Sequence, residues 1–165
     1  MSLVTLGQQL KAVPTPVEPL LAQVANSTAE TMALRGTPLR VECRVQALPM
    51  DADLMGSLLV NLVDNASKAS ESGQEILLSA EGRTISVQDH GRGVPPEAID
   101  RITEPFYMVD KSRSKRQGGS GLGLALVKRI ADAHNATLDI LSAPGEGTIV
   151  RVTFPEGPPE GGKEE

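Results

Sequence analysis

The spacing of apolar residues predicts two helices in the first half of the chain. Residues 16–35 carry apolar side chains at helical intervals, and residues 51–70 repeat that spacing over a longer stretch. Asp51 or Asp53 stands where an acidic side chain can cap the second helix. At 100° per residue, the second helix has one continuous apolar arc, which predicts that it packs against a core. That arc is formed by Met55, Leu58, Leu59, Leu62, Val63 and Ala66.

Strand patterns lie between and after these helices. Apolar and polar residues alternate over residues 38–45, and residues 75–89 contain two strand patterns around a turn at Glu81–Gly82. A short helix is expected near 96–101 and a longer one over 121–134, which Asn135 can end in a left-handed conformation. Residues 136–155 predict another pair of strands. Because several strands are joined by short turns, the pattern predicts an α+β, two-layer α/β sandwich. Its sheet is mixed, mainly antiparallel and of about five strands, packed on about three helices.

Composition narrows the classes of function. The 165 residues suggest one domain, expected over 15–155, with a tag or linker remnant at 1–14 and a disordered Pro/Gly/Glu-rich tail at 156–165. A net charge of −5 and only 2% aromatic residues argue against nucleic-acid binding. No signal peptide or apolar run of membrane-spanning length is found, so we expect a cytoplasmic protein without membrane contact.

The polar side of the helix over 51–70 has an unusual composition. Asn61, Asn65 and Lys68 fall within roughly 60° of arc on a helical wheel. Asparagine weakens a helix that Gln, Glu or Lys would support, so a merely solvated face is one interpretation and a functional face is the other. An asparagine oxygen beside the core edge suits Mg²⁺, which prefers hard oxygen ligands and shares them with phosphates.

Two glycine-bearing segments carry further candidates. In "QDHGRGVP" (88–95), an acid and two glycines follow a strand, which is typical of a turn but also places Asp89 at a strand end. In "RQGGSGLGLAL" (116–126), glycines crowd the start of a helix, where free N–H groups can bind an anion. The segment matches neither a Walker A loop nor a dinucleotide-binding fingerprint. Before it, a basic cluster in 107–120 could form a mobile lid over phosphates. The cluster is formed by Lys111, Arg113, Lys115 and Arg116.

Together, four segments resemble the N, G1, F and G2 boxes of sensor histidine kinases, in the same order and at similar spacing. They are "NLVDNASKAS", "QDHGRGVP", "EPFYMVDKSRS" and "GGSGLGLALVKRIADAH". The resemblance covers residues 15–155 and implies the Bergerat (GHKL) sandwich, which binds ATP between the N-box helix and the lid. His90, Arg92 and the "ITEPF" segment depart from common family residues.

The resemblance implies a role for individual residues. Asn65 resembles the Mg²⁺-binding asparagine, Asn61 its companion one turn earlier, and Lys68 the phosphate-contacting lysine. These three are the candidate catalytic residues, and Asp89 resembles the aspartate that accepts a hydrogen bond from the adenine amino group. The remaining ATP-binding candidates are Gly91, Gly93, Phe106, Lys115, Arg116, Gly119, Ser120, Gly121, Leu122 and Gly123.

The chain has two histidines, His90 and His134, and neither lies in a phosphoacceptor motif. The resemblance therefore implies the catalytic domain of a kinase, monomeric in isolation, which uses Mg²⁺ and ATP. Its partners would be the helical dimerisation and phosphohistidine domain of the same kinase and, through that kinase, a response regulator. Two alternatives stay open: an ATP-hydrolysing or serine-directed GHKL protein, which usually carries Glu where Asn61 stands, and a non-catalytic ATP-sensing module.

Overall fold

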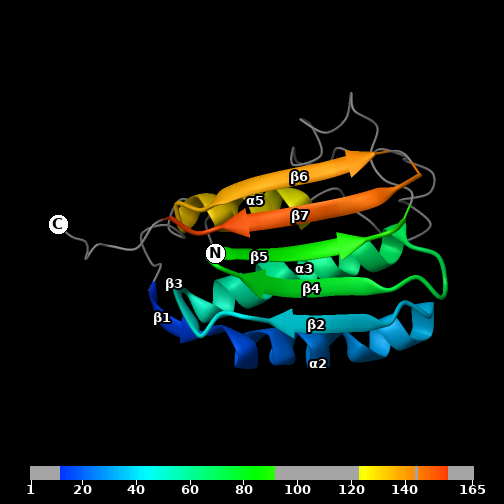
Figure 1. The fold of residues 1–165 in the computed structure, drawn as a ribbon, viewed down its shortest axis with the longest axis horizontal. Helices are drawn as coiled ribbons and strands as arrows, with labels where there is room; N and C mark the ends of the chain where they lie inside the picture. The colour runs from blue at the N-terminus through cyan, green and yellow to red at the C-terminus, as the bar shows by residue number, and fades with distance from the viewer. Residues whose placement is uncertain (1–11, 92–122, 144, 156–165) are drawn as a thin grey trace.

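The computed structural model describes residues 12–91, 123–143 and 145–155. Within them, three helices cover one face of a five-stranded sheet (Figure 1). The helices are α2 (Val17–Arg35), α3 (Ala52–Ala69) and α5 (Gly123–Ala133). This two-layer arrangement confirms the fold class predicted from the apolar spacing.

The main sheet has the order β2-β4-β5-β7-β6. Its strands are β2 (Leu39–Cys43), β4 (Ile76–Glu81), β5 (Thr84–Asp89), β6 (Thr137–Ala143) and β7 (Gly147–Thr153). β2 pairs with β4 in parallel, and the other three pairings are antiparallel, so the sheet is mixed and mainly antiparallel as expected. The parallel pair follows from the connection through α3, which returns the chain to the same end of the sheet.

A second, two-stranded sheet was not predicted. β1 (Val13–Pro16) pairs antiparallel with β3 (Ala47–Met50). Each strand has four residues, and three of the eight are prolines, so neither shows a readable alternation. β1 begins at Val13, within the stretch 1–14 for which the sequence indicated no strand.

Local signals account for the helix boundaries. Asp51, rather than Asp53, caps α3, because its carboxylate accepts a hydrogen bond from the Leu54 N–H at 3.2 Å. α2 ends at Gly36, which has a left-handed φ of 70°. After α5, Asn135 takes a left-handed φ of 56°, as predicted for the residue that stops this helix.

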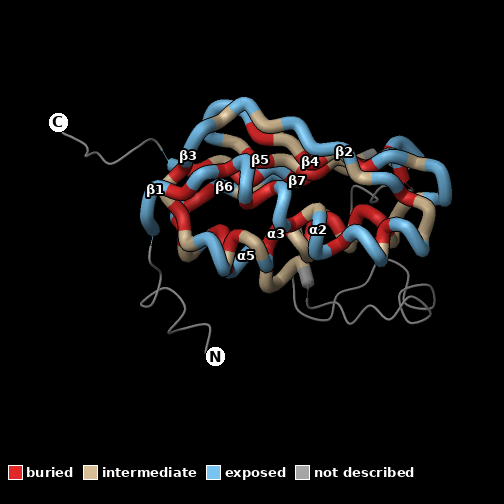
Figure 2. Tube along the Cα trace, turned by 90° about the horizontal axis from the view of Figure 1, so that it is seen from below, coloured by how far each residue is buried: buried red, intermediate tan, exposed pale blue. Residues whose placement is uncertain are grey.

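The core lies between the sheet and the helices (Figure 2). It is built almost entirely from Leu, Ile, Val, Met and Ala, as the scarcity of aromatic residues requires. Phe154 is its one buried aromatic among the described residues, and it lies against His134 with the two ring centroids 6.0 Å apart. No helix in the described part of the chain has the length and apolarity needed to cross a bilayer.

Candidate functional site

Asp89 stands at a position of β5 where the alternation along the strand predicts a buried apolar residue. Along β5, Ile85 and Val87 are buried on the helix-covered side, and Asp89 continues that alternation with only 6% of its surface exposed. Its Oδ1 accepts a hydrogen bond from the Gly91 N–H at 2.8 Å. A buried carboxylate is costly unless it is hydrogen-bonded, and the Gly91 N–H supplies one such bond.

Glycines allow other backbone segments to approach Asp89 closely. A Cβ on Gly91 would collide with the carbonyl group of Ala69, the last residue of α3. A Cβ on Gly147, at the start of β7, would lie 2.8 Å from the His90 Cα and still closer to the Asp89 carbonyl oxygen. The Asp89 segment is therefore held between the end of α3 and the start of β7.

Gln74 makes a second connection that the sequence did not reveal. Its Oε1 accepts a hydrogen bond from the Glu71 N–H at 2.7 Å, and its Nε2 donates to the His90 carbonyl oxygen at 3.0 Å. The loop after α3 is thus attached to the residue that follows Asp89. No local pattern signals this contact, because it joins residues 16 positions apart.

The structure separates the two asparagines of α3 by their surroundings. The Asn61 Nδ2 donates to the Ser57 carbonyl oxygen at 2.9 Å, and Asn61 borders a groove between α2 and α3. Asn65 is half-buried, and its amide makes no hydrogen bond to another described residue. It lies four residues before Ala69, about 6 Å or one turn along the helix axis.

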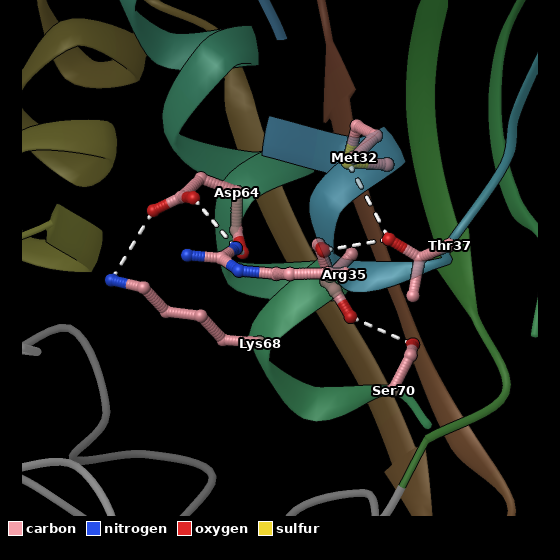
Figure 3. A network of polar contacts seen from close by, with 8 residues as sticks. Met32, Arg35, Thr37, Asp64, Lys68 and Ser70 are labelled. Carbon is pink, nitrogen blue, oxygen red and sulfur yellow. Dashed lines mark hydrogen bonds and ion pairs between the residues drawn. The ribbon is translucent and has the colours of Figure 1, made fainter. Parts of the chain in front are cut away.

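Lys68 is paired with a carboxylate on its own helix. Its Nζ lies 3.2 Å from the Asp64 Oδ2, and the Asp64 Oδ1 lies 2.9 Å from the Arg35 Nη1 of α2. Figure 3 shows the Asp64 carboxylate between the two cations. Sequence reasoning had singled out neither Arg35 nor Asp64. Since Asp64 and Lys68 are i,i+4 neighbours, a helical charge pattern could have found that half of the cluster.

His134 follows the last residue of α5 and has a structural role. It is 6% exposed, and its Nε2 accepts a hydrogen bond from the Asp51 N–H at 3.0 Å. Its Nδ1 lies 2.9 Å from the Ile130 carbonyl oxygen. A neutral ring that carries its proton on Nδ1 satisfies both contacts, so neither nitrogen is free for chemistry.

The remaining sequence candidates lie at the start of α5 or outside the described residues. Gly123 is the first residue of α5. The other eight lie outside the described residues, and so do the predicted short helix near 96–101 and the predicted lid over 107–120. They are Gly93, Phe106, Lys115, Arg116, Gly119, Ser120, Gly121 and Leu122.

The described residues contain no cluster of three or more His, Cys, Asp or Glu side chains that could hold a metal. The Asn65 amide fits a Mg²⁺ ion, because Mg²⁺ keeps several waters and is commonly shared with phosphates.

The chain is similar to known proteins in sequence and in fold. Residues 50–158 match the family model described as histidine kinase-, DNA gyrase B-, and HSP90-like ATPase. The phosphate regulon sensor protein PhoR of Pseudomonas aeruginosa is 40% identical over 86% of this chain and 33% of its own length. The sensor histidine kinase YkoH of Bacillus subtilis is 36% identical over 82% of this chain and 30% of its own length. The chain thus spans about a third of these curated relatives.

Solved structures show the same fold. Full-length ShkA, in complex with AMPPNP, superimposes with a TM-score of 0.75 at 27% identity, over 91% of this chain and 33% of that one. The nucleotide-free catalytic domain of histidine kinase ThkA gives a TM-score of 0.74 at 21% identity, over 87% of this chain and 96% of that one. The chain therefore belongs to the histidine kinase-, DNA gyrase B- and HSP90-like ATPase family, and it corresponds to the ATP-binding domain of the sensor histidine kinases in that family.

Proposed function

We propose that this chain binds Mg²⁺·ATP and transfers the γ-phosphoryl group to a histidine on a separate helical dimerisation domain of a two-component sensor kinase. The observation that carries the proposal is the proximity of a buried carboxylate to a polar helix face. Gly91 brings the Asp89 segment against the end of α3, one turn from Asn65. Under this proposal, Asp89 would bind the base, and the side chains on the polar face of α3 would bind the phosphates.

Asp89 supplies selectivity for the base. An ionised carboxylate can only accept hydrogen bonds, and the adenine amino group can donate one. Guanine presents a carbonyl oxygen at the corresponding position, so a buried carboxylate would repel it. The Gly91 N–H occupies one side of the Asp89 Oδ1 and fixes the direction in which the carboxylate can accept.

Asn65 and Lys68 would act at the phosphate end. The Asn65 amide oxygen would hold Mg²⁺, which neutralises phosphate charge, and the Lys68 ammonium would bind a phosphate oxygen directly. Phosphoryl transfer passes through a loose transition state, so positioning and charge stabilisation are the main tasks of the protein. The acceptor imidazole is itself the nucleophile, and no general base is required from this chain.

Asn61 argues against the alternative of an ATP-hydrolysing or serine-directed enzyme. Such proteins usually carry Glu at this position as a base, whereas an amide cannot accept a proton from water or a hydroxyl group. The Asn61 Nδ2 instead donates to its own helix at Ser57. Binding without transfer remains the competing outcome, and the experiment below distinguishes it.

The test combines binding and transfer. Calorimetry should show that ATP and ADP bind more tightly with Mg²⁺ than without it, and that Asn65→Ala removes this difference. Labelled ATP supplied with the helical domain of a cognate kinase should label a histidine of that domain, and Asn65→Ala should stop the labelling. Equal affinity with and without Mg²⁺ in both proteins would refute the metal site. Tight binding without any transfer would favour the ATP-sensing function.

A further inference from the structure

Asp64 shares its carboxylate between two cations from two different helices. The Arg35 Nη1 approaches the Oδ1 at 2.9 Å and the Lys68 Nζ approaches the Oδ2 at 3.2 Å, so each oxygen has its own partner (Figure 3). All three side chains are partly shielded: 33% of Arg35, 34% of Asp64 and 21% of Lys68 is exposed. The cluster carries one net positive charge.

Arg35 is well placed to remain on Asp64. It lies in the last turn of α2, which Gly36 and Thr37 close with N–H donations to the Ala33 and Met32 carbonyl oxygens. The same Nη1 also reaches the backbone carbonyl oxygen of Asp64 at 3.4 Å. Thr37 is bonded in turn to Ser67 of α3, with 2.7 Å between the two hydroxyl oxygens, so this end of α2 is attached to α3 by two polar contacts.

A helical wheel shows what the sharing means for Lys68. Around the helix axis, Asp64 lies about 100° from Asn65 and Lys68 lies about 60° from it. Both are turned to the side of α3 that faces α2. The Asp64 pairing therefore draws the ammonium away from Asn65. To bind a phosphate oxygen beside Asn65, Lys68 has to release Asp64. Without another cation, the release would leave the partly buried Asp64 carboxylate with no compensating charge, and this cost opposes the release.

We propose that Arg35 sets the affinity of the phosphate site, although it binds no phosphate itself. By compensating Asp64, it allows Lys68 to exchange the carboxylate for a phosphate oxygen. Arg35 is thus a positioning residue that acts through Asp64 and Lys68. The inference rests on the function proposed above, in which Lys68 binds phosphate.

The experiment compares nucleotide binding by four proteins: wild type, Arg35→Gln, Asp64→Asn and the double variant. Arg35→Gln should weaken Mg²⁺·ADP binding by about two- to fivefold, the range expected for ion pairs of this exposure. In the double variant, Asp64→Asn removes the competing charge and should restore the wild-type affinity or exceed it. Adenosine has no phosphate, so its affinity should be the same in all four proteins.

Arg40→Gln is the matched control. It changes the net charge equally, but Arg40 lies on the edge strand β2 and pairs with Glu42 and Glu75. We expect it to leave ADP affinity unchanged. Thermal melts would confirm that each variant is folded before binding is compared.

The outcomes separate the two proposals. If the wild type binds neither ADP nor adenosine, the proposed function fails, and the role of Arg35 fails with it. If the wild type binds ADP, three results would overturn the role of Arg35 alone. ADP affinity could be unchanged in Arg35→Gln, or it could fall there by no more than in Arg40→Gln. It could also fall in Arg35→Gln and stay low when Asp64→Asn is added. An equal loss for adenosine would likewise show a general structural effect.

Discussion

Gly91 offers a direct test of how the Asp89 segment is held. In Gly91→Ala, the new Cβ would lie 2.6 Å from the Ala69 carbonyl carbon, and closer still to the oxygen. Ordinary van der Waals contact begins at 3.4 Å, so the two backbone segments would have to separate by at least 0.8 Å. Both are backbone, with no flexible side chain to turn aside. The hydrogen bond from the Gly91 N–H to Asp89 lies at the point that must move.

The expected cost follows from this displacement. Forcing extra volume into a packed site costs about 1–3 kcal/mol. For a chain of this size, each kcal/mol lowers the melting temperature by about 2–4 °C, so Gly91→Ala should melt about 2–12 °C below the wild type. ATP affinity should fall as well, because Asp89 loses its fixed direction.

Gly56→Ala is the matched control for this substitution. Gly56 lies inside α3, and its added Cβ would meet the Leu20 Cδ1 at 3.8 Å, an ordinary contact. Alanine is the better helix former by about 0.5–1 kcal/mol, so this variant should be more stable than the wild type. Differential scanning calorimetry of both variants, with ATP titrations, makes the comparison. If Gly91→Ala matches the wild type in both stability and affinity, the close packing of the Asp89 segment on α3 does not position the carboxylate.

Three further predictions follow from Asp89 and the two histidines. Asp89→Asn should weaken ATP binding and narrow the difference in affinity between ATP and GTP, measured by competition titration. A wild-type protein that binds GTP as tightly as ATP would contradict the role proposed for Asp89. His134→Ala should lower the free energy of unfolding by about 1–3 kcal/mol, because the Asp51 N–H loses its acceptor. Urea denaturation measures the effect, and an unchanged denaturation midpoint would show that this hydrogen bond contributes nothing. The isolated chain with Mg²⁺·ATP should form no acid-labile, base-stable phosphohistidine, because both His134 nitrogens are engaged and His90 adjoins Asp89, the residue proposed to bind the base. Stoichiometric phosphate on either histidine would overturn this expectation.

The sequence by itself determined the three described helices and the strands of the main sheet, and it named most of the candidate residues that lie in the described part of the chain. Periodicity is a local property, so α3 with its Asn61, Asn65 and Lys68 face was readable without coordinates. The strand before Asp89 was readable for the same reason. The resemblance to the family motifs supplied the proposed roles, because four segments in order are far more specific than any one alone. The cap at Asp51 and the stop at Asn135 were also local, and the structure confirms both.

Only the tertiary structure decided how these parts meet. The pairing of β1 with β3, the contact of Gly91 with Ala69, and the bond between Asp51 and His134 join residues far apart in sequence. Such contacts leave no periodic signal, because each depends on how packed layers bring distant segments together. Arg35 shows this most clearly: in the sequence it is an ordinary helix-ending cation, and only the packing of α2 on α3 brings it to the carboxylate that holds Lys68.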